Sequence, residues 1–158
     1  MIILDEQFDQ PGSEWFFTGN AGYDFGKGLA HFGPNNAWVR ATSGWNAINR
    51  FQTVVPHTDY IVSAWLRFSD SLTDGYFSVR AAPELNGEGR ILTERKLVGP
   101  NHPNPSKDNY NRFRLRFDTQ GWERILLYVG LWGMGQDAWI QIDDVQVEND
   151  RVKLDDND

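Results

Sequence analysis

Apolar and polar residues alternate with a period of two along much of the chain. The clearest case is 110–118, where Phe113, Leu115 and Phe117 would share one face and the arginines between them the other. The segment 58–68 alternates in the same way. Because successive side chains of a strand point to opposite faces, each segment predicts a strand with one buried and one solvated face.

Segments of this kind recur at intervals of roughly ten residues, and Gly, Pro, Asn and Asp separate them. Helical periodicity is hard to find, so the pattern indicates an all-β protein. About ten strands in one domain indicate two packed sheets or a closed barrel. The Pro-rich segment 98–109 is predicted to be a long loop. We predict strands at 2–8, 14–18, 28–32, 37–41, 46–54, 58–68, 76–82, 89–97, 110–118, 124–132 and 138–148.

The composition fits one domain with a core, since the chain has 158 residues of which 40% are hydrophobic. We assign residues 1–149 to this domain and residues 150–158 to an acidic tail or linker. There are no cysteines, which excludes disulfides, a thiol nucleophile and a cysteine-based zinc site. The net charge of −7 disfavours nucleic acid and anionic membrane surfaces as partners.

No apolar run approaches the ~20 residues of a membrane span. The first ten residues also lack the basic and then apolar order of an export signal. We therefore expect a soluble, monomeric chain. Its acidic end is typical of a linker, which favours an excised module of a larger protein.

The motifs of several enzyme classes are absent from the sequence: G-x-S-x-G, the P-loop and H-E-x-x-H do not occur. Nothing groups the three histidines, His31, His57 and His102. A glycosidase needs two carboxylates across a cleft, and the 22 acidic residues leave that arrangement open. We predict that the chain is not an enzyme.

Two adjacent carboxylates, Asp143 and Asp144, lie in the middle of the predicted strand at 138–148. Neighbouring residues of a strand point to opposite faces, so at least one of the pair is aimed at an interior. A buried carboxylate needs a positive side chain, a cluster of N–H donors or a metal ion. The pair therefore predicts a polar site within the fold.

Two stretches resemble a known family. The opening ILDEQFDQPGSEWFFTGN resembles the start, and the closing AWIQIDDVQVEND the final strand, of carbohydrate-binding modules of the family 4/9/22 type. The resemblance spans nearly the whole chain, with the segments 28–32 and 58–68 as intervening strands. It implies an antiparallel two-sheet β-sandwich with jelly-roll topology. It also implies a polysaccharide or oligosaccharide ligand and an extracellular location, beside a glycoside hydrolase in a secreted protein.

The resemblance further implies a structural Ca²⁺ that ties the last strand to the N-terminal region. Carried over onto this chain, its ligands are the carboxylate of Asp143 and the backbone carbonyls of Gln7 and Gly28, and Glu6 or Asp5 adds a second charge. Calcium accepts carboxylate and carbonyl oxygens in flexible geometry, so a site assembled from distant strands is chemically reasonable. The alternative is that Asp143 accepts backbone N–H bonds at a strand bulge.

Modules of the resembled family bind sugar in a cleft on one sheet, where aromatic rings stack on pyranose faces and amides or arginines bind hydroxyls. Gln52 and Arg80 match the positions of a cleft amide and a cleft arginine in that family. The residues expected to face outward from the strands 46–54 and 76–82 are Ile48, Arg50, Gln52, Tyr76, Ser78 and Arg80.

The predicted strand at 124–132 is apolar on both faces, which indicates a covered surface or a binding floor. Tyr128 and Trp132 on it are the candidates for stacking on a sugar. Trp38 and Trp45 flank a glycine-containing turn and are candidate platforms at the rim. Trp15 is expected to be a core residue beneath the cleft.

These features predict a non-catalytic module that binds a β-glucan or xylan. If both Arg50 and Arg80 reach the cleft, a uronic-acid polymer is a second possibility, because guanidinium pairs with carboxylate in a bidentate manner. The rival class is a protein–protein interaction domain on the same fold, in an extracellular or virion assembly. A groove lined by Tyr76, Tyr128 and Trp132 favours sugar, and a flat apolar patch favours protein.

Overall fold

The computed structural model describes residues 1–9, 14–83, 89–99 and 109–150. Within them, every strand pairing is antiparallel, and no helix is long and apolar enough to cross a membrane. The all-β prediction is thereby confirmed. The strands of the described part are β1 (Ile2–Glu6), β2 (Trp15–Thr18), β3 (Ala21–Phe25), β4 (Asn35–Thr53), β5 (Asp59–Phe68), β6 (Gly75–Ala81), β7 (Ile91–Leu97), β8 (Asn111–Asp118) and β9 (Arg124–Asn149).

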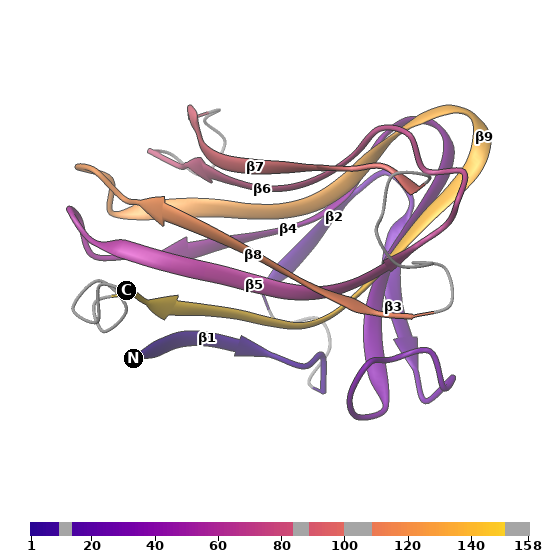
Figure 1. Ribbon diagram of the computed structural model, residues 1–158, viewed down its shortest axis with the longest axis horizontal. Helices are drawn as coiled ribbons and strands as arrows, with labels where there is room; N and C mark the ends of the chain where they lie inside the picture. Colours follow the sequence, from indigo (N-terminus) through magenta and orange to yellow (C-terminus); the bar gives the residue numbers. More distant parts are fainter. Residues whose placement is uncertain (10–13, 84–88, 100–108, 151–158) are drawn as a thin grey trace.

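Two long strands, β4 and β9, pair along their length, bend together and take part in both layers of the molecule (Figure 1). In one layer, residues 124–131 of β9 lie between β4 and β6, with β2 and β7 outside them. In the other layer, residues 140–149 of β9 pair with β5, which pairs with β8, while β1 and β3 extend the opposite side. The predicted two-layer β-sandwich is therefore confirmed.

The bend in the β4–β9 pair depends on glycine. Gly44 has a φ of 73°, in the left-handed region that favours glycine, and the register shifts between Ala41 and Ser43. A methyl group on Gly133 would lie 2.0 Å from the backbone nitrogen of Ser43, so no side chain fits there. The absence of two side chains lets the pair cross from one layer to the other without breaking.

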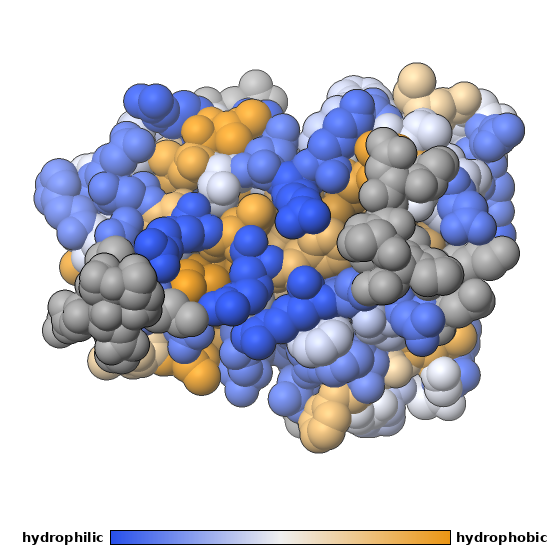
Figure 2. Space-filling model, viewed as in Figure 1, coloured by the Kyte–Doolittle hydropathy of each residue, from blue (hydrophilic) through white to orange (hydrophobic). Residues whose placement is uncertain are grey.

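The core lies between the two layers, where each strand contributes alternate residues. On β8, Phe113, Leu115 and Phe117 are buried and the arginines between them are exposed, as the alternation predicts. Side chains such as Phe77 and Ile140 have at most 1% of their surface exposed. On the side of the sandwich seen in Figure 2, polar side chains lie across an apolar band between the two layers. The packed interior supplies the main stabilisation of the fold.

The structure corrects several predicted boundaries. Residues 28–32 form bends and loop instead of a strand, because Gly28 and Gly33 have φ angles of 76° and 72° on either side. The short edge strand β3 was missed. The segments 37–41 and 46–54 belong to one strand, β4, and the segments 124–132 and 138–148 to one strand, β9.

The predicted end of the domain at residue 149 is one residue too early. Asp150, which we assigned to the tail, is 1% exposed, and its backbone N–H donates to the carbonyl of Asp59 at 2.9 Å. The domain therefore continues through Asp150. Most of the predicted loop at 98–109 and the rest of the tail lie outside the described residues.

Candidate functional site

A groove of about 500 Å³ runs over the outer face of the layer that contains β4, β9, β6 and β7. Alternate residues of each strand point outward, and the register of the strands places these residues side by side. Trp45 faces Trp132 across the β4–β9 pair, and Arg80 on β6 faces Leu126 on β9. The groove is lined by Trp45, Asn49, Tyr76, Arg80, Ile91, Glu94, Leu126, Tyr128 and Trp132.

Four aromatic rings form one end of the groove. The Trp45 ring lies 5.4 Å from that of Trp132, 5.7 Å from that of Tyr128 and 6.3 Å from that of Tyr76, measured between centroids. Trp132 keeps 48% of its surface exposed, whereas Tyr128 is 7% exposed. Trp132 therefore presents open ring surface, and the Trp45 ring packs against it.

Gly130 determines where the Trp45 ring lies. A methyl group on Gly130 would approach the Ala47 Cβ at 2.7 Å, the Asn46 carbonyl oxygen at 2.7 Å and the Trp45 Cη2 at 2.8 Å. The missing side chain lets the indole of Trp45 lie down across β9. The floor of the groove thus depends on a glycine on the strand beside Trp45.

Polar side chains surround Tyr128. The Arg80 Nε donates to the Tyr128 hydroxyl at 3.2 Å, and the guanidinium of Arg80 lies 5.7 Å from the centre of that ring. The Tyr128 hydroxyl donates to the Glu94 Oε2 at 3.2 Å, and the Ser78 hydroxyl donates to the same oxygen at 3.0 Å. This network fixes a guanidinium and a carboxylate beside the aromatic rings, where both can bind hydroxyl groups.

Tyr76 is held in place at the rim of the groove. Its hydroxyl donates to the Asp74 carboxylate, and the Lys96 ammonium lies 3.5 Å from Asp74. The hydrogen bond to Asp74, with burial and nearby negative charge, raises the pKa of Tyr76 to about 12. The phenol is therefore neutral at physiological pH, and its ring is fixed against Trp45.

Asn49 supplies a planar amide to the groove. It is 6% exposed, and its Nδ2 donates to the Phe16 carbonyl at 3.3 Å and to the Thr18 hydroxyl at 3.1 Å. These two bonds tie β4 to β2 and orient the amide. Asn49 was not among the predicted contacts, because the other face of this strand was expected to point outward.

The structure brings together five of the predicted sugar contacts, namely Trp45, Tyr76, Arg80, Tyr128 and Trp132. They come from three strands whose order in the layer could not be read from the sequence. Their role in binding stays a prediction.

The structure places Arg50 and Gln52 on the opposite face of β4, so their assignment to the cleft is wrong. The Arg50 guanidinium lies over the Trp15 ring at 5.7 Å and pairs with Glu6 at 3.5 Å and Glu14 at 3.3 Å. Gln52 donates to the carbonyl of Thr53 at 3.0 Å. The segment 46–53 carries polar and apolar residues on both faces, so its alternation alone does not show which face is outward.

Two predicted tryptophans, Trp38 and Trp15, do not line this groove. Trp38 lies on the outer face of the other layer, so its assignment to the same cleft is wrong. Trp15 is 8% exposed and its indole N–H donates to Glu6 at 2.8 Å, as expected for a core residue. Glu94 and Asn49 are the polar lining residues that the sequence did not single out.

The groove does not assemble the carboxylate pair of a glycosidase. Glu94 is the one carboxylate among its described lining residues. Because hydrolysis of a glycosidic bond needs two carboxyl groups on either side of it, the groove is suited to binding.

Asp143 and Asp144 both contact the loop that follows β3. The Asp143 Oδ2 accepts the N–H of Phe32 at 2.9 Å and its Oδ1 accepts the N–H of Asp144 at 2.8 Å. The Asp144 Oδ2 lies 2.6 Å from the His31 Nδ1. The two side chains were expected to point to opposite faces of the strand. However, Asp144 has a φ of 47° and the register to β5 shifts at this point, so a β-bulge interrupts the alternation.

Asp143 fits one part of the predicted calcium site. Its side chain is fully buried, and burial raises its pKa to about 6. The backbone N–H groups of Phe32, Asp144 and His31 lower this pKa, and the carboxylate of Asp144 raises it further. A positive partner would stabilise the charged form of a carboxylate buried in this way.

Glu6 does not fit the predicted calcium site. Its Oε2 accepts the N–H of Phe8 at 2.8 Å, and its Oε1 accepts the indole N–H of Trp15 at 2.8 Å and pairs with Arg50. The described residues hold no group of three or more His, Asp or Glu side chains suited to a metal. Asp143 is therefore the candidate charged ligand.

The fold is similar to the β-sandwich of carbohydrate-binding modules with solved structures. No family model matches the sequence, and no curated protein matches it. The class that the two end motifs predicted is confirmed at the level of the fold.

Three solved structures illustrate this similarity. The first is the CBM22-1 xylan-binding domain of Xyn10C from Paenibacillus barcinonensis, with a TM-score of 0.67 and 16% identity over 94% of each chain. A cleaved adhesin domain of Lys-gingipain from Porphyromonas gingivalis has a TM-score of 0.66 and 10% identity over 92% of this chain and 96% of its own. The family 61 module TmCBM61, solved with β-1,4-galactotriose, has a TM-score of 0.57 and 18% identity over 90% and 94%.

Proposed function

We propose that the protein is a non-catalytic carbohydrate-binding module that binds a neutral β-linked polysaccharide, of the xylan or β-glucan type, in the groove over β4, β9 and β6. The observation that carries the proposal is the aromatic cluster of Trp45, Trp132, Tyr128 and Tyr76 beside the Arg80–Glu94 network. An open aromatic surface next to fixed hydrogen-bonding groups suits a pyranose chain.

The chemistry of a pyranose matches this arrangement in two ways. One face of the ring presents C–H groups, which pack on the face of an indole such as Trp132. The hydroxyls at the ring edge both donate and accept hydrogen bonds, and Arg80, Glu94 and Asn49 offer donors and acceptors. Binding of this kind needs no chemical reaction.

The charge balance of the groove favours a neutral polymer. Arg80 and Glu94 are one cation and one anion on neighbouring strands, and the Lys96–Asp74 pair at the rim is balanced in the same way. Arg50, which would have added a second cation, lies on the inner face. The uronic-acid polymer therefore has less support than a neutral glycan, since a carboxylate ligand rewards an excess of positive charge.

The wider setting is also part of the proposal. A fold shared with a xylan-binding domain and with a galactotriose-binding module supports a place in a larger secreted protein, where the module would bring a glycoside hydrolase to its substrate. An extracellular location follows from that role. A monomer suffices, since one chain lines the whole groove.

The rival function is protein binding, and the likeness to an adhesin domain is the observation in its favour. The two functions differ in the surface that they need. A protein partner is favoured by a flat apolar patch, whereas the aromatics here line a groove that contains Arg80 and Glu94. This difference favours sugar.

Affinity electrophoresis tests the proposed function. Gels that contain xylan, a β-1,4-glucan, a β-1,3-glucan, a galactan or polygalacturonate would be compared with a gel without polymer. We expect at least one neutral polymer to retard the protein and polygalacturonate to retard it less. Retardation by none of the polymers would overturn the proposal and favour the protein-binding alternative.

Calcium remains a proposal centred on Asp143, with the carbonyls of Gln7 and Gly28 as neutral ligands. Its support is the full burial of the Asp143 carboxylate, which raises its pKa to about 6. Ca²⁺ bound there would supply a positive charge and would join β9 to the loops beside it.

Chelation tests the calcium proposal. Because a ligand that binds the folded state alone stabilises it, we expect EDTA to lower the Tm of the wild-type protein by at least about 5 °C. The variant Asp143→Asn should lose this sensitivity, and Glu6→Gln should keep it. Calorimetry after prolonged dialysis against EDTA measures the effect. An unchanged Tm in the wild type would leave hydrogen bonding as the whole role of Asp143.

A further inference from the structure

A second groove, of about 520 Å³, lies on the outer face of the other layer. It runs over β3, β4, β9 and β5, whereas the groove of the proposed function lies over β4, β9, β6 and β7. The two grooves are therefore on opposite faces of the sandwich. Its lining includes Trp38, Arg40, Arg67, Trp139 and Gln141.

Two half-buried tryptophans lie on neighbouring strands of this second groove. Trp38 on β4 faces Gln141 on β9, and Trp139 on β9 faces Arg40 on β4, so the two indoles are diagonal neighbours. Trp38 lies against Gly22 of β3, where a methyl group would be 3.0 Å from its Cζ2. The glycine leaves room for the indole beside β3.

Neither of these indoles is covered by another ring within the described residues. Trp65, on the same face, shows the contrast, because the His31 ring stacks on it at 3.9 Å with an interplanar angle of 11°. Trp38 and Trp139 are both partly exposed. Two aromatic surfaces in the second groove are therefore open to a ligand.

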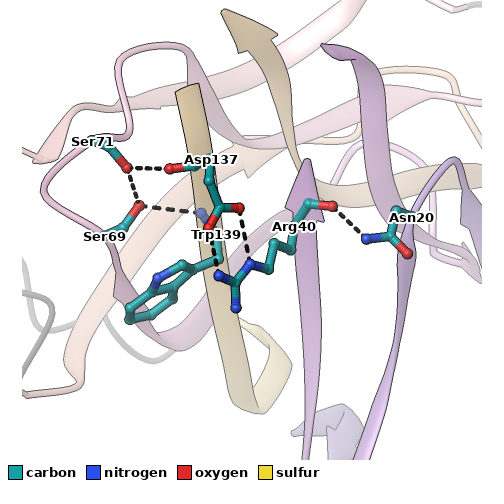
Figure 3. A network of polar contacts seen from close by, with 6 residues as sticks. All are labelled: Asn20, Arg40, Ser69, Ser71, Asp137 and Trp139. Atoms are coloured by element: carbon teal, nitrogen blue, oxygen red, sulfur yellow. Dashed lines mark hydrogen bonds and ion pairs between the residues drawn. The ribbon is translucent and has the colours of Figure 1, made fainter. Parts of the chain in front are cut away.

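The two arginines of the second groove are held by one edge each. The Arg40 Nε donates to the Asp137 Oδ1 at 2.9 Å, and its Nη2 binds the other oxygen of the same carboxylate (Figure 3). The Arg67 Nε donates to the Gln141 Oε1 at 2.7 Å, and its guanidinium lies 5.1 Å from the centre of the Tyr110 ring. Among the described residues, the Nη1 group of each arginine donates to no acceptor, so each keeps a fixed and available donor.

The backbone around Trp139 and Arg40 is fixed as well. Ser69 accepts the backbone N–H of Trp139 at 3.1 Å, and Ser71 donates to the backbone carbonyl of Asp137 at 2.6 Å (Figure 3). Asn20 donates to the backbone carbonyl of Arg40 at 2.6 Å. The serine contacts hold β9 against the turn after β5, and the Asn20 contact holds β4 against the residue before β3. The groove is therefore preorganised for a ligand.

Charged side chains of the second groove have partners of their own. Asp137 pairs with Arg40, Lys27 lies 3.7 Å from Asp24, and Arg67 is held by the amide of Gln141. A groove with open indoles, fixed donors and an amide has the same chemistry as the first groove, so it is suited to the same class of ligand.

We propose that the Trp38–Trp139 groove is a second carbohydrate-binding site, which takes neutral pyranose residues on the face opposite the first groove. The proposal rests on the proposed function for the ligand class and on separate residues for the site. Two sites on opposite faces would let one module hold two polysaccharide chains, or two stretches of one chain, and so gain avidity without new contacts.

Indole N–H signals in ¹H–¹⁵N spectra test this inference, because the seven tryptophans give separate probes of the two grooves. Xylohexaose, cellohexaose and laminarihexaose would be titrated into the wild-type protein and the variants Trp139→Ala and Trp132→Ala. We expect the signals of Trp38 and Trp139 to shift in the wild type, and that of Trp38 to shift in Trp132→Ala as well.

The variants separate the two sites. Trp139→Ala should weaken the binding reported by Trp38 at least about tenfold and leave the binding reported by Trp45 within about twofold. Shifts confined to Trp45 and Trp132 would overturn the second site and leave the proposed function intact. Absence of shifts with every oligosaccharide, together with no retardation in the polysaccharide gels, would overturn both.

Discussion

Replacing Trp132 by alanine is expected to weaken polysaccharide binding by about 10- to 100-fold, which corresponds to about 1.4 to 2.8 kcal/mol. Trp132 offers the most exposed ring of the groove, with 48% of its surface accessible, so its loss removes the main stacking surface. The same exposure means that the substitution leaves no cavity in the core. Titration calorimetry with the polymer that retards the protein in gels would measure the change.

A matched control comes from another exposed aromatic residue. Phe25, on the edge strand β3, is 53% exposed and lines neither groove. Phe25→Ala should bind the polymer with the affinity of the wild type. If Trp132→Ala bound as tightly as Phe25→Ala, the ligand would not stack on this ring and the groove would lose its role in the proposed function.

Gly130→Ala is expected to reduce stability and binding together. The added methyl group would overlap with Ala47, the carbonyl of Asn46 and the indole of Trp45, all within 2.8 Å. Overpacking of this kind costs about 1 to 3 kcal/mol, which would lower the Tm by roughly 2 to 10 °C for a chain of this size. Because Trp45 must move, affinity for the polymer should also fall at least about tenfold.

Gly121→Ala provides the comparison for this variant. A methyl group on Gly121 would have no neighbour within 4 Å, so its Tm and affinity should stay close to those of the wild type. Thermal unfolding followed by circular dichroism gives the Tm, and the same calorimetric titration gives the affinity. Should Gly130→Ala bind normally at a temperature where it is folded, the position of Trp45 would not matter for the ligand.

Much of the fold could be predicted because strand alternation is a local property. On β8, the arginines are exposed and the apolar residues between them are buried, so the sequence itself shows the inward face. The same holds for most of β5. The motifs at the two ends led to the class of fold, since they lie on β1, β2 and β9, which the sandwich brings into its two layers.

Part of the candidate site could be predicted and part could not. Tyr128 and Trp132 could be predicted because the segment 124–132 is apolar on both faces, and Arg80 because it matches a cleft arginine of the resembled family. Tyr76 followed from the alternation of the segment 76–82. Arg50 was misplaced, because its neighbours on β4 are mixed on both faces and a shift by one residue exchanges the two faces.

The sequence by itself determined the period of the strands, the absence of thiol chemistry, and the need of at least one of Asp143 and Asp144 for a polar partner. Only the tertiary structure decided which face of β4 looks outward, since that depends on the packing of Trp15, Glu6 and Arg50 behind it. The bulge at Asp144 and the second groove likewise arise from strands brought together across the chain. Alternation is a local property of the chain, whereas a groove requires several strands in register.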